Sequence, residues 1–203
     1  MNQTTIGALT LMLTTTTCTQ ATTIYMHDFE DGTGQGTLVS QVVQKTYVDD
    51  GLVPIVGNYF GLLYAGQSYT KVLTDTFEAG FTYELSLDHF AREDQAAGYG
   101  GEAIMLEIGY DNGGFTALSS QIFAETGDDP ATLLRRAINW ATTAGGSEVG
   151  QSIVFRITDP IGNNAAHQAG VDNIEVIQWI PELGSYALIV GLLSLTSVMV
   201  RRR

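Results

Sequence analysis

The alternation of apolar and polar residues predicts a chain built of many short strands. Along 81–88, apolar side chains occupy every second position and polar side chains the positions between them. A period of two is expected of a half-buried antiparallel strand. Similar segments rich in β-branched and aromatic residues predict nine strands, at 23–29, 37–43, 69–77, 81–90, 103–110, 115–123, 133–142, 152–158 and 171–178.

Turn sequences separate these strands and leave little room for helices. Asp111-Asn112-Gly113-Gly114 is one such turn, with residues that tolerate positive φ. A short helix at 129–137 is the one alternative, because Asp129 could cap it and Pro130 could stand in its first turn. No stretch of 3.6-residue period alternates with the strands. The pattern therefore favours an all-β fold, an antiparallel β-sandwich.

The two ends of the chain follow a different pattern. An apolar core at 6–13 with no acidic residue before Asp28 predicts a signal peptide over 1–21, ending at Ala21. Acylation of Cys18 is an alternative to its removal with the signal. An uncharged run at 183–200 predicts one transmembrane helix. The expected division is thus a signal peptide at 1–21, a β-sandwich domain at 22–180 and a tail at 181–203.

The tail combines three features in a fixed order. Pro181, Glu182 and Leu183 precede the apolar run, and Arg201, Arg202 and Arg203 follow it. The arginines are predicted to stop transfer and to stay on the cytoplasmic side. A plain membrane anchor would explain the hydropathy, but it does not require Pro-Glu before the helix.

Charge narrows the classes of partner. The net charge is −13, and three of the nine basic residues are the terminal arginines. A strongly acidic body argues against nucleic acid and anionic lipid as partners, and for solubility or cation binding. The single cysteine, Cys18, lies in the predicted signal, so the body has no disulfide. Packing must stabilise it, with a metal ion as a further candidate.

The order of motif, helix and arginines resembles the PEP-CTERM sorting signal of exopolysaccharide-producing Gram-negative bacteria, with Leu183 in place of the second proline. The resemblance implies an exosortase as partner. It also implies an intermediate anchored in the inner membrane, followed by delivery to the cell surface, outer envelope or extracellular matrix.

The body resembles jelly-roll carbohydrate-binding modules at its first and last strands. The residues that carry the likeness are Asp28-Phe29-Glu30-Asp31-Gly32 and Asp172-Asn173-Ile174. The resemblance implies that these two strands lie side by side, with a structural Ca²⁺ where they meet. Glu30 and Asp172 would be its matching carboxylates, with Asp28 and Asp31 as neighbours. Solvated acids at a strand end and an Asx turn are the alternatives.

Candidate chemistry elsewhere is sparse. Tyr59 and Tyr64 are candidate sugar-binding aromatics, whereas Trp140 and Trp179 are expected in the core. Glu84 and Asp88 share one strand face, and no catalytic set is predicted. We therefore expect a non-catalytic surface or matrix protein that binds polysaccharide or another envelope component. An exported hydrolase or lyase acting on such polymers is the alternative, and a structural coat protein without a glycan ligand is a third.

Overall fold

The computed structural model describes residues 20–30, 43–46, 59–64, 66–91, 103–124, 133–160 and 168–180. Residues Ala21–Pro181 cluster as one compact unit. Ten strands lie in the described residues: β1 Gln20–His27, β2 Val43–Thr46, β3 Tyr59–Tyr64, β4 Ser68–Thr76, β5 Thr82–Ala91, β6 Ala103–Asp111, β7 Phe115–Ala124, β8 Leu134–Ala141, β9 Ser152–Thr158 and β10 Gln168–Ile180.

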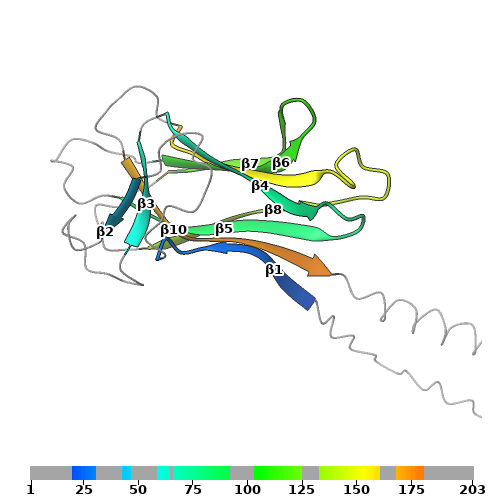
Figure 1. Ribbon diagram of the computed structural model, residues 1–203, viewed down its shortest axis with the longest axis horizontal. Coiled ribbons are helices and arrows are strands. Elements are labelled where there is room, and N and C mark those ends of the chain that lie inside the picture. Colours follow the sequence, from blue (N-terminus) through cyan, green and yellow to red (C-terminus); the bar gives the residue numbers. More distant parts are fainter. Residues whose placement is uncertain are drawn as a thin grey trace, which may run out of the picture. The chain divides into compact units, whose positions relative to one another are not determined.

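The strands form two sheets, one above the other in Figure 1. Sheet A has the order β2-β3-β10-β5-β8, and β1 also pairs with β10. Sheet B has the order β4-β9-β6-β7. The ladders from β3 to β10, β10 to β5, β5 to β8, β4 to β9 and β9 to β6 to β7 are all antiparallel. The predicted fold class, an antiparallel β-sandwich, is confirmed.

Alternate residues of each sheet fill one apolar core between them. On β5, Tyr83, Leu85 and Leu87 are fully buried and belong to this core. Ile153 and Phe155 of β9 join them from sheet B. Because side chains alternate along a strand, Glu84 and Ser86 point away from the core, to the outer face of sheet A.

The first and last strands lie side by side, as the module resemblance implied, because β1 pairs with β10. β1 also connects the two sheets. Its Tyr25 hydroxyl lies 2.8 Å from the Tyr69 hydroxyl of β4, and its ring lies 5.2 Å from that of Phe155. The N-terminal strand therefore contributes to the packing of both sheets.

The predicted strands match the structure except at two places. The segment predicted at 37–43 is described only at its last residue, where β2 begins. The second place is Tyr59–Tyr64, which forms β3 and is not among the nine predicted strands. Residues 134–137, which the helical alternative included, are part of β8, and their burial alternates as in a strand. In the described residues no helix is long and apolar enough to cross a membrane, and the expected helix of 183–200 lies outside them.

Candidate functional site

The outer face of sheet A brings together polar side chains from three neighbouring strands. Cross-strand register places residues of β10, β5 and β8 in rows. From one end, the rows are Trp179–Thr82–Ala141, Ile177–Glu84–Asn139, Glu175–Ser86–Ala137 and Asp172–Asp88–Arg135. The first row, at Thr82, and the last, at Asp88, are six residue steps apart on β5, a length of about 20 Å at about 3.4 Å per residue.

A β-bulge in β10 interrupts this face. Asp172 pairs with Asp88 and Glu175 pairs with Ser86, so β10 has one residue more than β5 in this interval. Asn173 has a φ of 47°, in the left-handed region that asparagine tolerates better than most residues. Its backbone N–H donates to Asp172 Oδ1 over 2.7 Å. Its side-chain Nδ2 donates to Asp88 Oδ2 over 2.8 Å.

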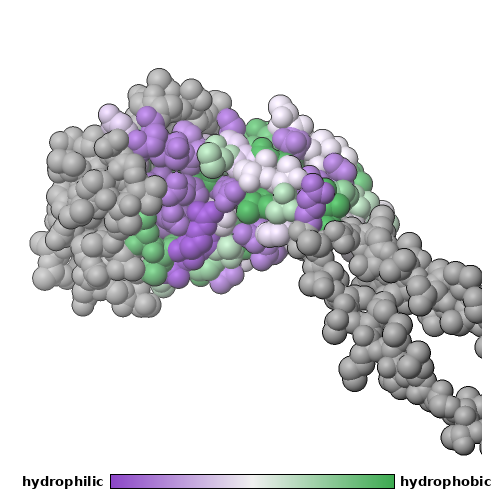
Figure 2. All heavy atoms as spheres, turned by 90° about the horizontal axis from the view of Figure 1, so that it is seen from below, coloured by the Kyte–Doolittle hydropathy of each residue, from purple (hydrophilic) through white to green (hydrophobic). Residues whose placement is uncertain are grey.

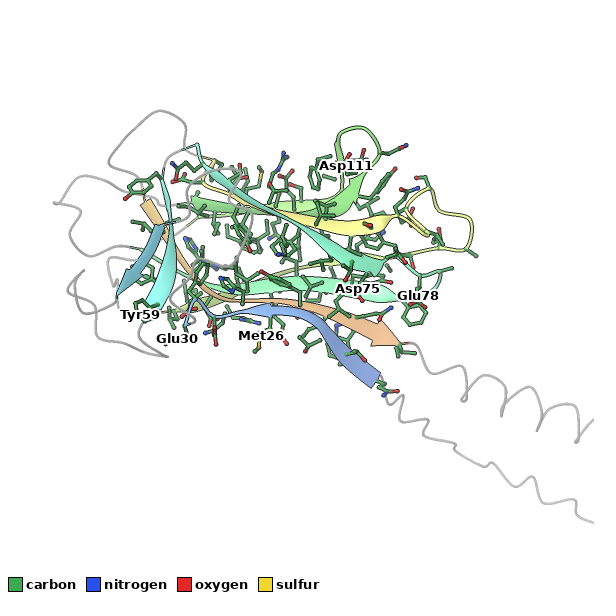
Figure 3. All side chains as sticks on the ribbon, viewed as in Figure 1. Met26, Glu30, Tyr59, Asp75, Glu78 and Asp111 are labelled. Atoms are coloured by element: carbon green, nitrogen blue, oxygen red, sulfur yellow. The ribbon has the colours of Figure 1, made fainter. Side chains whose placement is uncertain are left out.

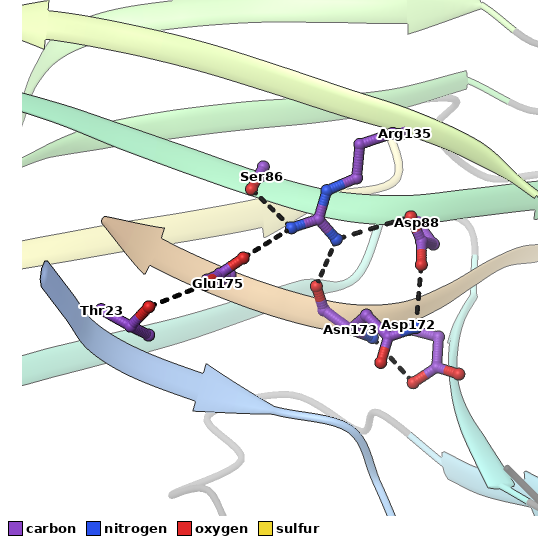
Figure 4. Close-up of polar contacts among 7 residues, drawn as sticks. All are labelled: Thr23, Ser86, Asp88, Arg135, Asp172, Asn173 and Glu175. Carbon is purple, nitrogen blue, oxygen red and sulfur yellow. Dashed lines mark hydrogen bonds and ion pairs between the residues drawn. The ribbon is translucent and has the colours of Figure 1, made fainter. Parts of the chain in front are cut away.

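Arg135 of β8 binds both sides of the bulge (Figure 4). Its guanidinium donates to the Asn173 carbonyl and to Ser86 Oγ, each over 2.8 Å. It also pairs with Glu175 at 3.0 Å and with Asp88 at 3.4 Å. We call these five residues the Arg135 cluster. A planar guanidinium with five donors suits such a set of acceptors, so the cluster holds β5, β8 and β10 in register.

The two rows beyond the Arg135 cluster form a second group, which we call the Trp179 patch: Glu84, Asn139, Ile177 and Trp179. Glu84 and Asn139 are direct cross-strand partners, and Ile177 lies opposite Glu84 on its other side. Trp179 is a diagonal neighbour of Glu84, within reach of an aromatic side chain. Among the described residues, neither the Glu84 nor the Asn139 side chain has a hydrogen bond or ion pair.

The side chains next to the patch on β8 are small and exposed to solvent. Ala137 and Ala141 flank Asn139 on β8, and all three are exposed. Glu84, Ile177 and Trp179 are half-buried. Seen from the side on which β1 and β10 lie, hydrophilic residues gather across the middle of the surface, with hydrophobic residues beside them (Figure 2). The patch thus offers a ring, a carboxylate and an amide to a ligand from solvent.

On the outer face of sheet B, two pairs of polar side chains bind one another. Arg156 of β9 pairs with the buried Glu107 of β6 and lies 4.5 Å from the ring of Phe115. Ser68 and Thr158 are hydrogen-bonded to each other over 2.8 Å. Because these side chains are partnered with one another, they have less capacity left for a ligand.

The predicted metal residues Asp28 and Glu30 lie in the turn after β1. Asp28 Oδ1 accepts a hydrogen bond from the Glu30 N–H over 3.2 Å. Glu30 Oε1 accepts one from the Tyr59 N–H over 2.9 Å, which ties this turn to the start of β3. Figure 3 shows Glu30 and Tyr59 at the same end of the sandwich.

The other predicted ligand residues do not complete a set. Asp172 is buried in the bulge, where it accepts from Asn173. Asp31 lies outside the described residues, as do Pro181, Glu182, Leu183 and the terminal arginines. Within the described part of the chain, no three His, Cys, Asp or Glu side chains gather as a metal-binding group. The calcium site stays a prediction.

The aromatic residues are placed differently from what the sequence suggested. Tyr59 packs against the main core, and Tyr64 packs against a separate cluster of Phe60, Leu62 and Phe90. Residues five apart on a strand point to opposite faces, so the two tyrosines do not form one binding surface. Trp140 packs against the core as expected. Trp179 does not: it lies on the outer face of sheet A.

The bulge explains the error for Trp179. Val171 points into the core. With strict alternation, the odd-numbered residues from 173 to 179 would point into the core as well. The extra residue at Asn173 reverses the pattern, so that Ile174 and Val176 are buried instead. The only sequence signal was the Asp172-Asn173 pair, typical of a turn or bulge, inside a predicted strand.

Comparisons with known proteins identify the architecture. No family model matches the chain, and no curated protein matches its sequence. Solved structures do match. The Stig cyclase FisC of Fischerella sp. TAU, in complex with an indole compound, has a TM-score of 0.60 at 14% identity, covering 80% of this chain and 99% of the cyclase.

Carbohydrate-binding modules match as well. The CBM22-1 xylan-binding domain of Paenibacillus barcinonensis Xyn10C has a TM-score of 0.50 at 16% identity, covering 77% of this chain and 94% of that domain. The CBM22-1–CBM22-2 tandem of the same protein has a TM-score of 0.54 at 14% identity, covering 79% of this chain and 47% of the tandem. The shared feature is the β-sandwich fold. At these identities the likeness shows the fold alone, because one fold carries many functions.

Proposed function

We propose that the protein is an exported surface or matrix protein whose β-sandwich binds polysaccharide through the Trp179 patch. A pyranose presents an apolar face and a rim of hydroxyl groups. An indole ring offers a flat apolar surface. A carboxylate accepts hydrogen bonds, and an amide both donates and accepts them. The patch supplies all three on one side of the sheet.

The observation that carries the proposal is the pairing of Glu84 with Asn139. They face each other across β5 and β8, Trp179 is a diagonal neighbour of Glu84, and neither side chain has a hydrogen-bond partner among the described residues. Elsewhere on the same face the polar side chains hold one another, as Arg135 holds Asp88 and Glu175. An aromatic ring with a few polar groups placed beside it is a combination that ligand sites use to bind and to orient a ligand.

The Arg135 cluster supports the patch by fixing its shape. β10 leaves the bulge at Glu175, only two residues before Ile177 and four before Trp179. Glu175 is bound by Arg135 and also accepts a hydrogen bond from Thr23 of β1 over 2.9 Å. Side chains held in this way keep the following residues in register with β5. A preorganised patch loses less conformational entropy when it binds.

Catalysis is the alternative function for the same face. Glu84 and Asp88 lie four residues apart on β5, about 14 Å along the strand. Glycosidases hold their two carboxyl groups about 5 to 10 Å apart. Asp88 is in addition bound by Arg135 and Asn173. These facts favour binding over hydrolysis by this pair.

Export and sorting complete the proposal. The support is the sequence order of an apolar N-terminal core, Pro181-Glu182-Leu183, an apolar run and three arginines. We propose that an exosortase processes the tail after the inner-membrane intermediate forms. Deletion of the exosortase gene in the producing bacterium should leave a longer, membrane-bound form, detected by immunoblot of cell fractions. An unchanged product would contradict the sorting step alone.

Co-sedimentation tests the binding function. Full-length protein in detergent is mixed with the producing bacterium's insoluble exopolysaccharide, and the supernatant is assayed for protein and for new reducing ends. We expect saturable depletion of protein without released sugar. Released reducing ends that disappear in a Glu84→Gln variant would instead support the enzyme alternative. No depletion from this polymer or from xylan would contradict polysaccharide binding.

A further inference from the structure

Glu84 is the carboxylate that the outer face of sheet A leaves uncompensated. Asp88 and Glu175 are paired with Arg135. Asp172 is 1% exposed and accepts a hydrogen bond from Asn173. The Glu84 side chain is half-buried and has no hydrogen-bond or ion-pair partner within the described segments. A ligand in the Trp179 patch therefore meets one carboxylate that forms no ion pair in the part of the chain that the structure describes.

The neighbours of Glu84 also favour a positive charge. Trp179 is its diagonal neighbour, and the face of an indole ring attracts a cation more strongly than any other aromatic side chain. Asn139, directly opposite, has a carbonyl oxygen that can accept from an ammonium group. The three side chains together provide a carboxylate, an aromatic ring and an amide oxygen, which is a suitable environment for an ammonium group.

The net charge of the whole molecule also favours a positively charged ligand. The net charge is −13, and all but one of the 22 acidic residues lie between residues 22 and 180. Figure 3 shows Asp75 and Glu78 at the end of the sandwich where β10 ends. Such a field concentrates cationic polymers near the surface and repels acidic ones. A uronic acid polymer is thus a poor ligand for this face.

We propose that the Trp179 patch binds a polysaccharide of amino sugars with free amines, with Glu84 binding the ammonium group and Trp179 contacting the same sugar. This inference rests on the proposed polysaccharide binding and names the chemical class of the ligand. The free amine distinguishes this class from neutral glycans and from N-acetylated ones, which present the same ring without the positive charge.

Calorimetry with matched oligosaccharides tests it. The full-length protein in a neutral detergent is titrated with glucosamine hexamer, N-acetylglucosamine hexamer, xylohexaose and oligogalacturonate, at a pH where the amines are protonated. We expect the glucosamine hexamer to bind about fivefold more tightly than its acetylated form at low salt. That preference should shrink at high salt because screening weakens exposed charge pairs.

Two variants with the same charge change separate the site from the general field. Glu84→Gln should reduce the preference for the amine form to less than about twofold. Asp111→Asn, at the end of β6 on the other sheet (Figure 3), should leave it unchanged, because the amide oxygen can still accept from the Gly114 N–H. Equal losses in both variants would show non-specific attraction and overturn the inference.

The remaining outcomes are also decisive. Equal binding of the glucosamine and acetylated hexamers, or stronger binding of xylohexaose, would overturn the amino-sugar inference while polysaccharide binding still holds. Strongest binding of oligogalacturonate would overturn it as well. Failure of all four to bind would contradict both the inference and the proposed function.

Discussion

Asn173 donates a hydrogen bond over 2.8 Å to Asp88, from the extra residue of the β10 bulge to the neighbouring strand. The bond links the Asp172-Asn173-Ile174 motif of β10 to β5, the strand that carries Glu84. The bulge decides which side chains of β10 reach solvent, because it reverses the alternation of everything after it. Trp179 is on the outer face for that reason.

Asn173 should tolerate glycine better than alanine. Glycine keeps the positive φ of 47° without strain but loses the hydrogen bond to Asp88, which has a net value of about 1 kcal/mol. Alanine loses the same bond and adds about 1 kcal/mol of backbone strain. Urea unfolding of Asn173→Gly and Asn173→Ala measures the order. A more stable alanine variant would show that the left-handed conformation is not required.

Loss of Arg135 should destabilise the sandwich by about 1 to 2 kcal/mol. Its guanidinium holds the Asn173 carbonyl, Ser86, Asp88 and Glu175, but the side chain is 42% exposed, so the ion pairs count for little. Arg135→Lys keeps the charge and loses the planar fork, so it should recover less than half of the loss. Equal stability of Arg135→Ala and the native chain would mean that the cluster does not support the bulge.

His89 should make stability fall as pH falls below about 6.5. Burial, and then the charge of Arg136, lower the pKa of His89 to about 4. The unfolded chain therefore binds a proton near its ordinary pKa of about 6.5, before the folded chain does. Stability is complete above that pH and is lost between about 6.5 and 4. From pH 7 to pH 5 the loss is about 2 kcal/mol.

The comparison that isolates His89 uses its leucine variant. His89→Leu removes the titrating group. The drop in the free energy of unfolding from pH 7 to pH 5 should therefore be about 2 kcal/mol smaller in the variant than in the native chain, whatever the absolute stability of each. Urea denaturation at both pH values gives the four numbers. Parallel pH profiles for the two proteins would exclude His89 as the cause.

Glu30 combines an observed structural contact with a predicted metal site. Its Oε1 accepts from the Tyr59 N–H, and an amide oxygen can do the same. In chelator, Glu30→Gln should therefore keep its stability within about 0.5 kcal/mol, while Glu30→Ala loses about 1 kcal/mol. If the calcium prediction holds, Ca²⁺ raises the Tm of the native chain and not of Glu30→Gln. No rise in either protein would exclude the site.

The hydrophobic pattern was sufficient for most of the fold. Strands with clear alternation, such as β5, were predicted almost to the residue, because burial of one face leaves a strong signal. The stretch that forms β3 could be interpreted from the sequence either as a loop or as a strand. It contributes to two apolar clusters on opposite faces, so it reads as a continuous apolar run rather than an alternating one.

The candidate site was harder to predict because it depends on register. Glu84 was singled out from β5 alone, but its partner Asn139 lies 55 positions later, on a strand whose pairing no local pattern reveals. Trp179 was assigned to the core because large aromatic side chains usually pack there, whereas the bulge at Asn173 places it on the outer face. The Arg135 cluster depends on that same bulge, so the sequence singled out Asp88 but neither Glu175 nor the arginine that binds both acids.

Paired aromatic truncations test the central claim, that polysaccharide binds the outer face of sheet A. Full-length protein, Trp179→Ala and Phe115→Ala are titrated calorimetrically with glucosamine hexamer, N-acetylglucosamine hexamer and xylohexaose. Phe115 is the matched aromatic on sheet B. The account predicts at least about tenfold weaker binding for Trp179→Ala and a change below about twofold for Phe115→Ala. The reverse order, or full binding by Trp179→Ala, would contradict it.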